Sequence, residues 1–239
     1  MTDGPWGPDP ALVSSSAHVF VESLDHPSLG DADAHHLGRV LRLRDGEIVS
    51  ITDGHGRWRL CEFRKTDVSL VVAGDIQSPN VGPATFGVAV SVPKGDRIDN
   101  VVQKITEIGA ACIVLFRSDH SIVRWDEGQA ERQLSRLRAI ARSASMQSRR
   151  LSLPTLSVVS SLDALLAQGD LVIATIDGPP MVQASEHRVV AVGPEGGWSS
   201  RERDIAIRGP HATVGLGSTV LRTDTAAVAA AVVLAFHQR

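Results

Sequence analysis

Three glycines, a proline and a glutamate follow a short apolar run near the end of the chain. VVAV is succeeded by GPEGGW, so Gly193, Gly196 and Gly197 fall within residues 193–197. Because glycine has no Cβ, backbone amides and carbonyls in such a segment can approach a ligand closely. The segment matches neither GxGxxG nor GxxxxGK[ST], and no lysine follows it to meet a β- or γ-phosphate. The pattern therefore fits either a ligand loop that is not built for a nucleoside triphosphate or a tight turn with a surface glutamate.

A second loop of this kind, LGSTVLRTDTA, lies at 216–226. Leu221 and Arg222 place an apolar wall and a guanidinium beside the same space. The helix predicted at 224–239 begins here, and a helix N-terminus favours an anion or a carboxylate. We expect Thr223 or Asp224 to be its N-cap, since both side chains can accept from backbone N–H groups.

Both loops belong to a region of alternating strands and helices. The runs that predict strands are 85–93, 112–116, 171–176, 189–192 and 213–217. The stretches that predict helices are 97–110, 127–150, 199–207 and 224–239. Such alternation is typical of a mainly parallel α/β sheet, whose ligand site lies at the carboxyl ends of the strands.

The first part of the chain has a different pattern. Short β-type runs broken by turns lie at 18–23, 47–53, 56–63 and 69–76, with one helical piece at 31–44. Strands at this regular spacing predict a small β-barrel domain over 18–80. Residues 1–17, rich in Pro, Gly, Asp and Ser, are expected to form a flexible tail. Residues 78–84 are expected to link the barrel to a second domain at 84–239.

Charge is unevenly distributed along the chain. The formal net charge is −3 over 239 residues, yet residues 129–150 carry six arginines against one acid, Glu131. On a helix these arginines flank an apolar face, which fits either a solvated surface or one that follows a phosphate backbone. Of the 24 basic residues 21 are arginine, which favours bidentate contact with phosphate.

Other features bear on compartment and cofactor. Cys61 and Cys112 have no CxxC or Cys/His spacing, so we expect a reduced, cytoplasmic compartment and no metal site. No basic segment followed by an apolar one opens the chain, so we expect no secretory signal. The longest apolar stretch, 226–236, is too short to span a bilayer, so we expect no membrane segment.

GPEGG at 193–197, followed by LGSTVLRTDTA at 216–226, resembles the paired motifs of the RsmE family of ribosomal RNA methyltransferases, within the SPOUT class. HHLGRVLRLRDGE at 35–47, with ITDGHGR at 51–57, is similar to the family's N-terminal PUA-like barrel. The stretches at 91–110 and 141–154 resemble its central part. The resemblance covers nearly the whole chain.

The resemblance implies an α/β SPOUT methyltransferase domain with a C-terminal trefoil knot, preceded by a PUA-like RNA-binding barrel. It implies S-adenosylmethionine (SAM) held in the knot by three loops, here 174–179, 193–198 and 215–222. It also implies a homodimer that acts on assembled small ribosomal subunits and methylates N3 of a uridine in 16S rRNA near the decoding region.

Carried onto this chain, the resemblance assigns residues to roles. The expected cofactor-binding residues are Thr175, Val192, Gly193, Glu195, Gly196, Gly197, Leu216, Gly217, Ser218, Val220, Leu221 and Thr225. The expected RNA-binding residues are Arg39, Arg42, Arg44, Lys94, Arg138, Arg142 and Arg149. Arg222 and Arg150 are the candidates to stabilise charge on uracil O2 and O4 as N3 loses its proton. Glu195, Asp224 or a water is the candidate proton acceptor.

The chain departs from the family pattern at three positions. His18 stands where arginine is usual, Met146 where glutamate is usual, and Asp224 where glutamate is commoner. The first change removes a guanidinium that could contact RNA. The second removes a carboxylate, and the third shortens the reach of one without changing its charge.

Two other functions are compatible with these patterns. A noncatalytic rRNA-binding protein would use the barrel and the basic helix alone, and would have no need of the two glycine-containing loops. A methyltransferase of the same fold could instead modify another rRNA position, a ribose 2′-O or a different base. A dinucleotide-binding fold is set aside, because its glycine fingerprint follows the first strand and here the glycines come late.

Overall fold

The computed structural model describes residues 9–78, 85–93, 95, 97–121, 125–169, 171–181, 188–208 and 212–237. The chain forms two compact units. Unit 1 comprises Met1–Pro83 and Ser145–Leu153, and unit 2 comprises Ala84–Ala144 and Pro154–Arg239.

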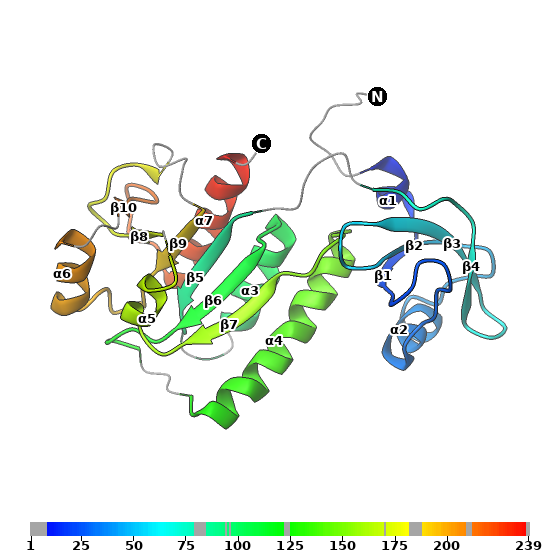
Figure 1. Ribbon diagram of the computed structural model, residues 1–239, viewed down its shortest axis with the longest axis horizontal. Helices are drawn as coiled ribbons and strands as arrows, with labels where there is room; N and C mark the ends of the chain where they lie inside the picture. Colours follow the sequence, from blue (N-terminus) through cyan, green and yellow to red (C-terminus); the bar gives the residue numbers. More distant parts are fainter. Residues whose placement is uncertain are drawn as a thin grey trace. The chain divides into compact units, whose positions relative to one another are not determined.

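Unit 1 is built on a four-stranded sheet in the order β1–β2–β3–β4 (Figure 1). The strands are β1 (Ala17–Phe20), β2 (Ile48–Thr52), β3 (Trp58–Arg64) and β4 (Ser69–Val72). β1 pairs with β2 in parallel, and the other two pairs are antiparallel. All four runs predicted as barrel strands thus form strands. The predicted helical piece divides into α2 (Asp31–His35) and the π-helix η1 (His36–Val40).

The prediction of a flexible tail over 1–17 is wrong for residues 9–17; residues 1–8 lie outside the described residues. Helix α1 (Pro10–Ser14) has a proline at its first position, where the fixed φ of proline suits a helix start. The Asp9 side chain caps it by accepting from Ala11 N at 2.8 Å. Leu12 is buried, and Ala17 begins β1. A start signal and one buried leucine therefore order this segment.

The prediction of one continuous second domain over 84–239 also needs correction, because Ser145–Leu153 packs in unit 1. Gly56 N donates to Leu151 O at 3.2 Å, and His55 and Ser152 form a β-bridge. The guanidinium of Arg149 donates to Ser15 O at 2.6 Å. The segment is therefore fixed to the first sheet mainly through its own backbone.

His18 lies at the centre of these contacts. Its side chain is only 2% exposed, with Nδ1 2.8 Å from Ser50 Oγ and Nε2 2.9 Å from Arg150 O. Because a carbonyl oxygen can only accept, Nε2 carries the hydrogen. Burial lowers the pKa of His18 to about 4, so the ring is neutral near pH 7. At the position where the family has an arginine, this chain has a structural histidine.

Unit 2 is an α/β layer structure around a six-stranded, all-parallel sheet in the order β10–β8–β9–β5–β6–β7 (Figure 1). The strands are β5 (Gly87–Ser91), β6 (Cys112–Phe116), β7 (Thr155–Val159), β8 (Val172–Ala174), β9 (Val189–Val192) and β10 (Thr213–Val214). Every residue of the central strand β5 is buried. Both faces are covered, as continuous apolar strands require.

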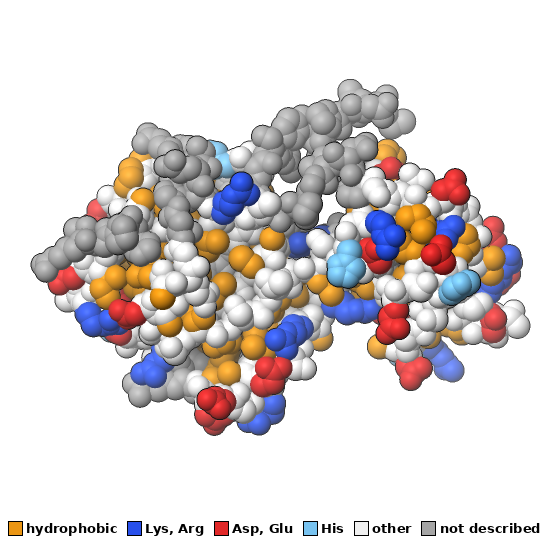
Figure 2. Space-filling view, in the orientation of Figure 1, with side chains coloured by type: hydrophobic (Ala, Val, Ile, Leu, Met, Phe, Trp, Pro, Cys, Tyr) orange, Lys and Arg blue, Asp and Glu red, His pale blue; other side chains and the backbone are white. Residues whose placement is uncertain are grey.

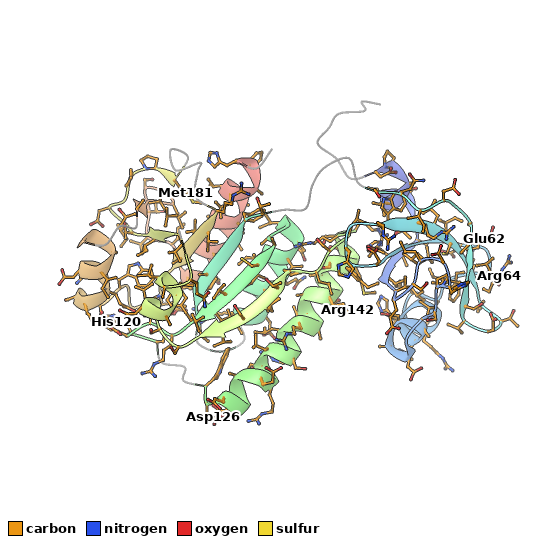
Figure 3. All side chains as sticks on the ribbon, viewed as in Figure 1. Glu62, Arg64, His120, Asp126, Arg142 and Met181 are labelled. Carbon is orange, nitrogen blue, oxygen red and sulfur yellow. The ribbon has the colours of Figure 1, made fainter. Side chains whose placement is uncertain are left out.

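Helices cover the two faces of this sheet. Helices α3 (Arg97–Ile108), α4 (Glu127–Gln147) and α7 (Thr223–His237) contribute to the larger apolar core, and α5 (Leu162–Leu166) and α6 (Ser200–Arg208) to the other. Asp126, labelled at the start of α4 in Figure 3, accepts from Gln129 N at 2.7 Å and caps that helix. The α/β class is confirmed, whereas β7 and α5 were not predicted.

The burial of His18 predicts a pH dependence of folding. The folded pKa of about 4 lies below the ordinary value of 6.5, so between these values the unfolded chain binds a proton that the folded chain does not. The free energy of unfolding should therefore fall by about 3 kcal/mol as pH drops from 6.5 to 4. Urea titrations of wild type and His18→Gln over this range measure the difference. Equal pH slopes for the two proteins would contradict the prediction.

Candidate active site

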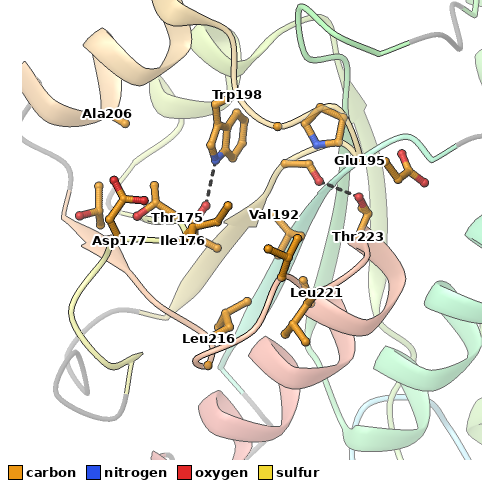
Figure 4. A pocket seen from close by; sticks show the side chains of 18 of the residues that line it. Thr175, Ile176, Asp177, Val192, Glu195, Trp198, Ala206, Leu216, Leu221 and Thr223 are labelled. Carbon is orange, nitrogen blue, oxygen red and sulfur yellow. Dashed lines mark hydrogen bonds between the residues drawn. The ribbon is translucent and has the colours of Figure 1, made fainter.

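The carboxyl ends of β8, β9 and β10 surround a cavity of about 450 Å³ (Figure 4). Its walls come from the segments that follow these strands, within 174–177, 192–198 and 216–221, from α6 and from the start of α7. Val192, Leu216 and Leu221 give it an apolar side, as Figure 4 shows. The site lies where a parallel sheet is expected to bind ligands.

The segment Gly193–Trp198 is a tight turn closed by its own residues. Gly197 has φ +71° and its N–H donates to Pro194 O at 2.9 Å. A Cβ on Gly193 would lie 2.9 Å from the indole of Trp198, so no side chain fits there. Trp198 Nε1 in turn donates to Ala174 O at 2.8 Å (Figure 4). The turn is therefore attached to the end of β8.

One side chain joins the two motif loops. Thr223, 2% exposed at the start of α7, donates its hydroxyl to Gly193 O at 2.9 Å (Figure 4). The expectation that Thr223 or Asp224 is the N-cap is wrong: α7 begins at Thr223, and Ala226 N donates to Arg222 O at 2.8 Å. The threonine hydroxyl is used between loops rather than within the helix.

Two glycines allow a close crossing of backbone beside the cavity. A Cβ on Gly178 would lie 2.4 Å from the carbonyl carbon of Val214, and one on Gly215 would lie 2.5 Å from Gly178 O. Gly215 N donates to Pro179 O at 2.7 Å, and Met181 N donates to Gly215 O at 3.0 Å. The segment after β8 is thus paired directly with the end of β10.

Three charged side chains stand on the cavity wall: Asp177, Glu195 and Arg203. Glu195 Oε1 is 3.2 Å from Arg97 Nη1, at the first residue of α3. Arg203 Nη2 is 3.5 Å from Ser200 Oγ. The wall therefore presents charges of both signs beside a largely apolar lining.

Most of the residues expected to bind the cofactor line this cavity. They are Thr175, Val192, Gly193, Glu195, Gly197, Leu216, Gly217, Val220 and Leu221. Gly196, Ser218 and Thr225 are not on its wall. Of the proposed catalytic residues, Arg222 is exposed between two lining residues, whereas Arg150 lies in unit 1. Burial lowers the pKa of Arg150 to about 10.

The residues expected to bind RNA have different surroundings. Arg39, Arg42 and Arg44 are exposed in unit 1, on and after η1. Arg138 pairs with Glu131 at 2.9 Å, and Arg142 is half-buried. Arg149 is bonded to Ser15 inside unit 1, and Lys94 lies outside the described residues.

The surface of unit 1 carries mixed charge. Basic and acidic side chains alternate on its visible face (Figure 2), in keeping with ion pairs such as Arg57–Asp53 at 2.8 Å and Arg64–Glu62 at 2.9 Å. Among the described residues, no ion pair involves Arg39, Arg42 or Arg44. These three arginines are therefore exposed and take no part in the ion pairs described for unit 1.

Several site residues were given no role from the sequence. Trp198 falls within the expected loop 193–198 and directly follows GPEGG, and that adjacency was a usable signal. Asp177 falls within the expected loop 174–179, but nothing in its spacing marks it as part of a wall. Arg97 and Arg203 reach the site through helices α3 and α6. Such contacts depend on the tertiary fold.

The described residues contain no group of three or more His, Cys, Asp or Glu side chains placed to hold a metal ion. None of the helices described is both long enough and apolar enough to cross a bilayer.

Comparison with known families gives the class of protein. Residues 81–235 match the family model of an RNA methyltransferase domain, and 29–72 match that of an RNA methyltransferase PUA domain. A parallel α/β unit with a strand-end cavity, joined to a PUA unit, is therefore an RNA methyltransferase architecture.

Similar proteins of known name identify the family within this class. The Mycobacterium bovis protein named ribosomal RNA small subunit methyltransferase E is 31% identical, over 83% of this chain and 81% of that protein. The Bacillus subtilis protein of the same name is 28% identical, over 83% and 85%. The chain belongs to the RsmE family of ribosomal RNA small subunit methyltransferases, as its paired motifs predicted.

Solved structures agree in fold. A methyltransferase from Legionella pneumophila, in complex with bound SAM, has a TM-score of 0.79 at 25% identity and covers 91% of this chain and 96% of its own. A ribosomal RNA small subunit methyltransferase E from Neisseria gonorrhoeae, bound to SAM, has a TM-score of 0.70 at 28% identity, covering 90% and 94%.

The hydrogen bond from Thr223 to Gly193 predicts that removing the threonine hydroxyl lowers the free energy of unfolding. Thr223→Val keeps the shape but leaves the half-buried Gly193 carbonyl without its donor, so we expect a loss of about 1 kcal/mol of unfolding free energy. Urea denaturation measures it. Thr225→Val, at an exposed position on the same helix, is the control and should be nearly neutral. Equal stability of both variants would contradict the role given to Thr223.

The close approach of Gly178 to the Val214 backbone predicts a larger loss of stability when a side chain is added there. Gly178→Ala places a Cβ against the Val214 backbone, and we expect a loss of about 3 kcal/mol or more, or no folded protein. Gly128→Ala in α4, where a Cβ meets ordinary contacts, should instead stabilise by about 0.5–1 kcal/mol. Thermal and denaturant unfolding compare the two. A Gly178→Ala protein as stable as wild type would rule out the close crossing.

Proposed function

We propose that this chain is a SAM-dependent methyltransferase that modifies N3 of a uridine in 16S rRNA of the small ribosomal subunit. The observation that carries the proposal is the cavity built by the two motif loops and joined by Thr223 and Gly193. Membership of the RsmE family and the names of its relatives support the rRNA substrate.

The cavity suits SAM by size and by chemistry. A volume of about 450 Å³ lies in the usual range for small-molecule sites. Val192, Leu216 and Leu221 offer an apolar wall for a purine, and Gly193 and Gly217 line the cavity without a side chain. Asp177, Glu195 and Arg203 supply charge for an amino-acid tail. Both SAM-bound neighbours named above share this fold.

The chemistry divides between cofactor and protein. When bound, SAM supplies an electrophilic methyl group on a sulfonium centre. The protein must orient uracil and stabilise the negative charge that spreads to O2 and O4 as N3 loses its proton. Arg222, exposed beside the cavity, is our candidate for that role. Burial within unit 1 makes Arg150 the weaker candidate.

Two contacts reduce the number of candidate acceptors for the uracil N3 proton. Arg97 Nη1 lies 3.2 Å from Glu195 Oε1. We therefore propose that this carboxylate holds its loop in place and does not accept the N3 proton. Asp224 Oδ1 accepts from Thr225 N at 2.9 Å. We propose that a water takes the N3 proton.

We propose that unit 1 binds rRNA as a PUA-like domain through Arg39, Arg42 and Arg44. Their exposure and the absence of an ion pair to any of them among the described residues support contact with phosphate, which positions RNA without reading its sequence. Arg138 and Arg142 on α4 are the second group proposed to follow the phosphate backbone.

Two structural expectations belong with this function. The close passage of Gly178 against Val214 and Gly215 supports the trefoil knot proposed for the C-terminal part of unit 2. Helix α7 exposes Val232 by 38% and Phe236 by 69%, one turn apart. An apolar pair on this terminal helix supports the proposed homodimer, in which a second copy covers it.

The test is methyl transfer from labelled SAM to small subunits from a strain that lacks this gene, followed by reverse transcription. An N3 methyl blocks base pairing, so we expect a single new stop at a decoding-region uridine. Arg222→Ala should lower the rate by roughly 10²–10³ with SAM affinity kept. Arg188→Ala, at the amino edge of the same sheet, is the control.

The remaining outcomes separate the alternatives. Label in rRNA without a stop would indicate a ribose or another position that does not pair. Absence of both label and SAM binding would leave only the RNA-binding function.

A further inference from the structure

The loop after β6 is fixed to the N-terminus of α6. The Asp119 carboxylate accepts from Arg201 Nε and Nη2, both at 3.0 Å, and from Ser199 Oγ at 2.6 Å. The contacts from Arg201 and Ser199 lower the pKa of Asp119. Arg201 also donates to Asp163 at the start of α5 at 2.8 Å. Charge-assisted bonds in this bidentate form hold a loop in one geometry.

A buried carboxylate, that of Glu202, also connects the loop after β6 to α6. Glu202 is fully buried, with Oε1 accepting from Asp119 N at 3.0 Å and Oε2 from Ser199 N at 2.9 Å. Glu202 N donates to Ser199 Oγ at 3.1 Å, so the two residues form a reciprocal capping box. The loop and the first turn of α6 therefore move as one block.

His120 projects from this block onto the turn at 194–197. It is labelled in Figure 3 beside α6, and its Nδ1 lies 3.0 Å from Gly197 O. Because the carbonyl only accepts, Nδ1 must carry the hydrogen. A Cβ on Gly196 would lie 3.4 Å from His120 Cβ, so the glycine and the histidine also pack together. The imidazole thus supports the face of the turn formed by Gly196 and the Gly197 carbonyl.

The same turn lines the cavity through Gly193, Pro194, Glu195 and Gly197. Its internal backbone bond is the one from Gly197 N to Pro194 O at 2.9 Å, and Gly197 has φ +71°. A glycine-rich turn of this kind has many accessible conformations, so an external bond at Gly197 restricts it effectively. Fixing it before the ligand arrives removes an entropic cost of binding.

We propose that His120 is a positioning residue for the cofactor, holding the 194–197 turn in its binding geometry through Nδ1–H and Gly197 O. The proposal rests on SAM being the ligand of the cavity. Asparagine places its side-chain amide near the position of Nδ1, whereas glutamine places it nearer that of Nε2. The asparagine variant should therefore restore what alanine loses, and the glutamine variant should not.

The experiment is calorimetric titration with SAM of wild type, His120→Ala, His120→Gln and His120→Asn. We expect roughly three- to tenfold weaker binding for alanine and glutamine, the value of one net hydrogen bond, and near-wild-type binding for asparagine. His26→Ala, an exposed position in unit 1, is the control. Thermal unfolding of each variant separates a local effect from loss of fold.

Amide hydrogen exchange without cofactor gives an independent reading. His120→Ala should speed exchange at 195–198, with His120→Asn restoring protection. Unchanged exchange, or SAM affinity in His120→Ala equal to wild type, would overturn the proposal. Wild-type protein that does not bind SAM, with faster exchange in His120→Ala, would refute the cofactor role and the proposed function while leaving the contact itself established.

Discussion

The hydrogen bond from Thr223 Oγ1 to Gly193 O is the interaction on which the site depends. Gly193 is also covered by the Trp198 indole, which donates to Ala174 O, so a single residue without a side chain is the meeting point of three segments. Each segment follows a different strand of the parallel sheet. Without this junction, the apolar wall and the charged groups would belong to separate loops, and no cavity of fixed shape would result.

The two units use arginine in different ways. In unit 1 the segment Ser145–Leu153 packs on the first sheet, where Arg149 bonds to Ser15 and the Arg150 carbonyl accepts from His18. The Arg149 side chain thus stabilises the fold of unit 1, whereas Arg150 contributes its backbone carbonyl. In unit 2, Arg97 and Arg201 hold carboxylates that fix loops around the cavity. Arg222 and the arginines near η1 are exposed.

The sequence predicted much of the fold because its signals are local. Buried parallel strands such as CIVLF and VVAV are continuous apolar runs, and glycine spacing marked the two loops that line the cavity. It missed β7, an edge strand with alternating exposure, and α5, which is only 5 residues long. It also missed α1, although Asp9 and Pro10 are a helix start. The contacts of Arg97 and His120 could not be predicted, because each residue is far in sequence from its partner. Only the folded sheet brings them together.

The most direct test of the central claim, that three strand-end loops form the SAM site, is amide hydrogen exchange with and without SAM. If these loops hold SAM, protection should increase within 174–178, 193–198 and 215–222, with little change in unit 1. Protection centred on unit 1 or on α4, or none at saturating SAM, would contradict it.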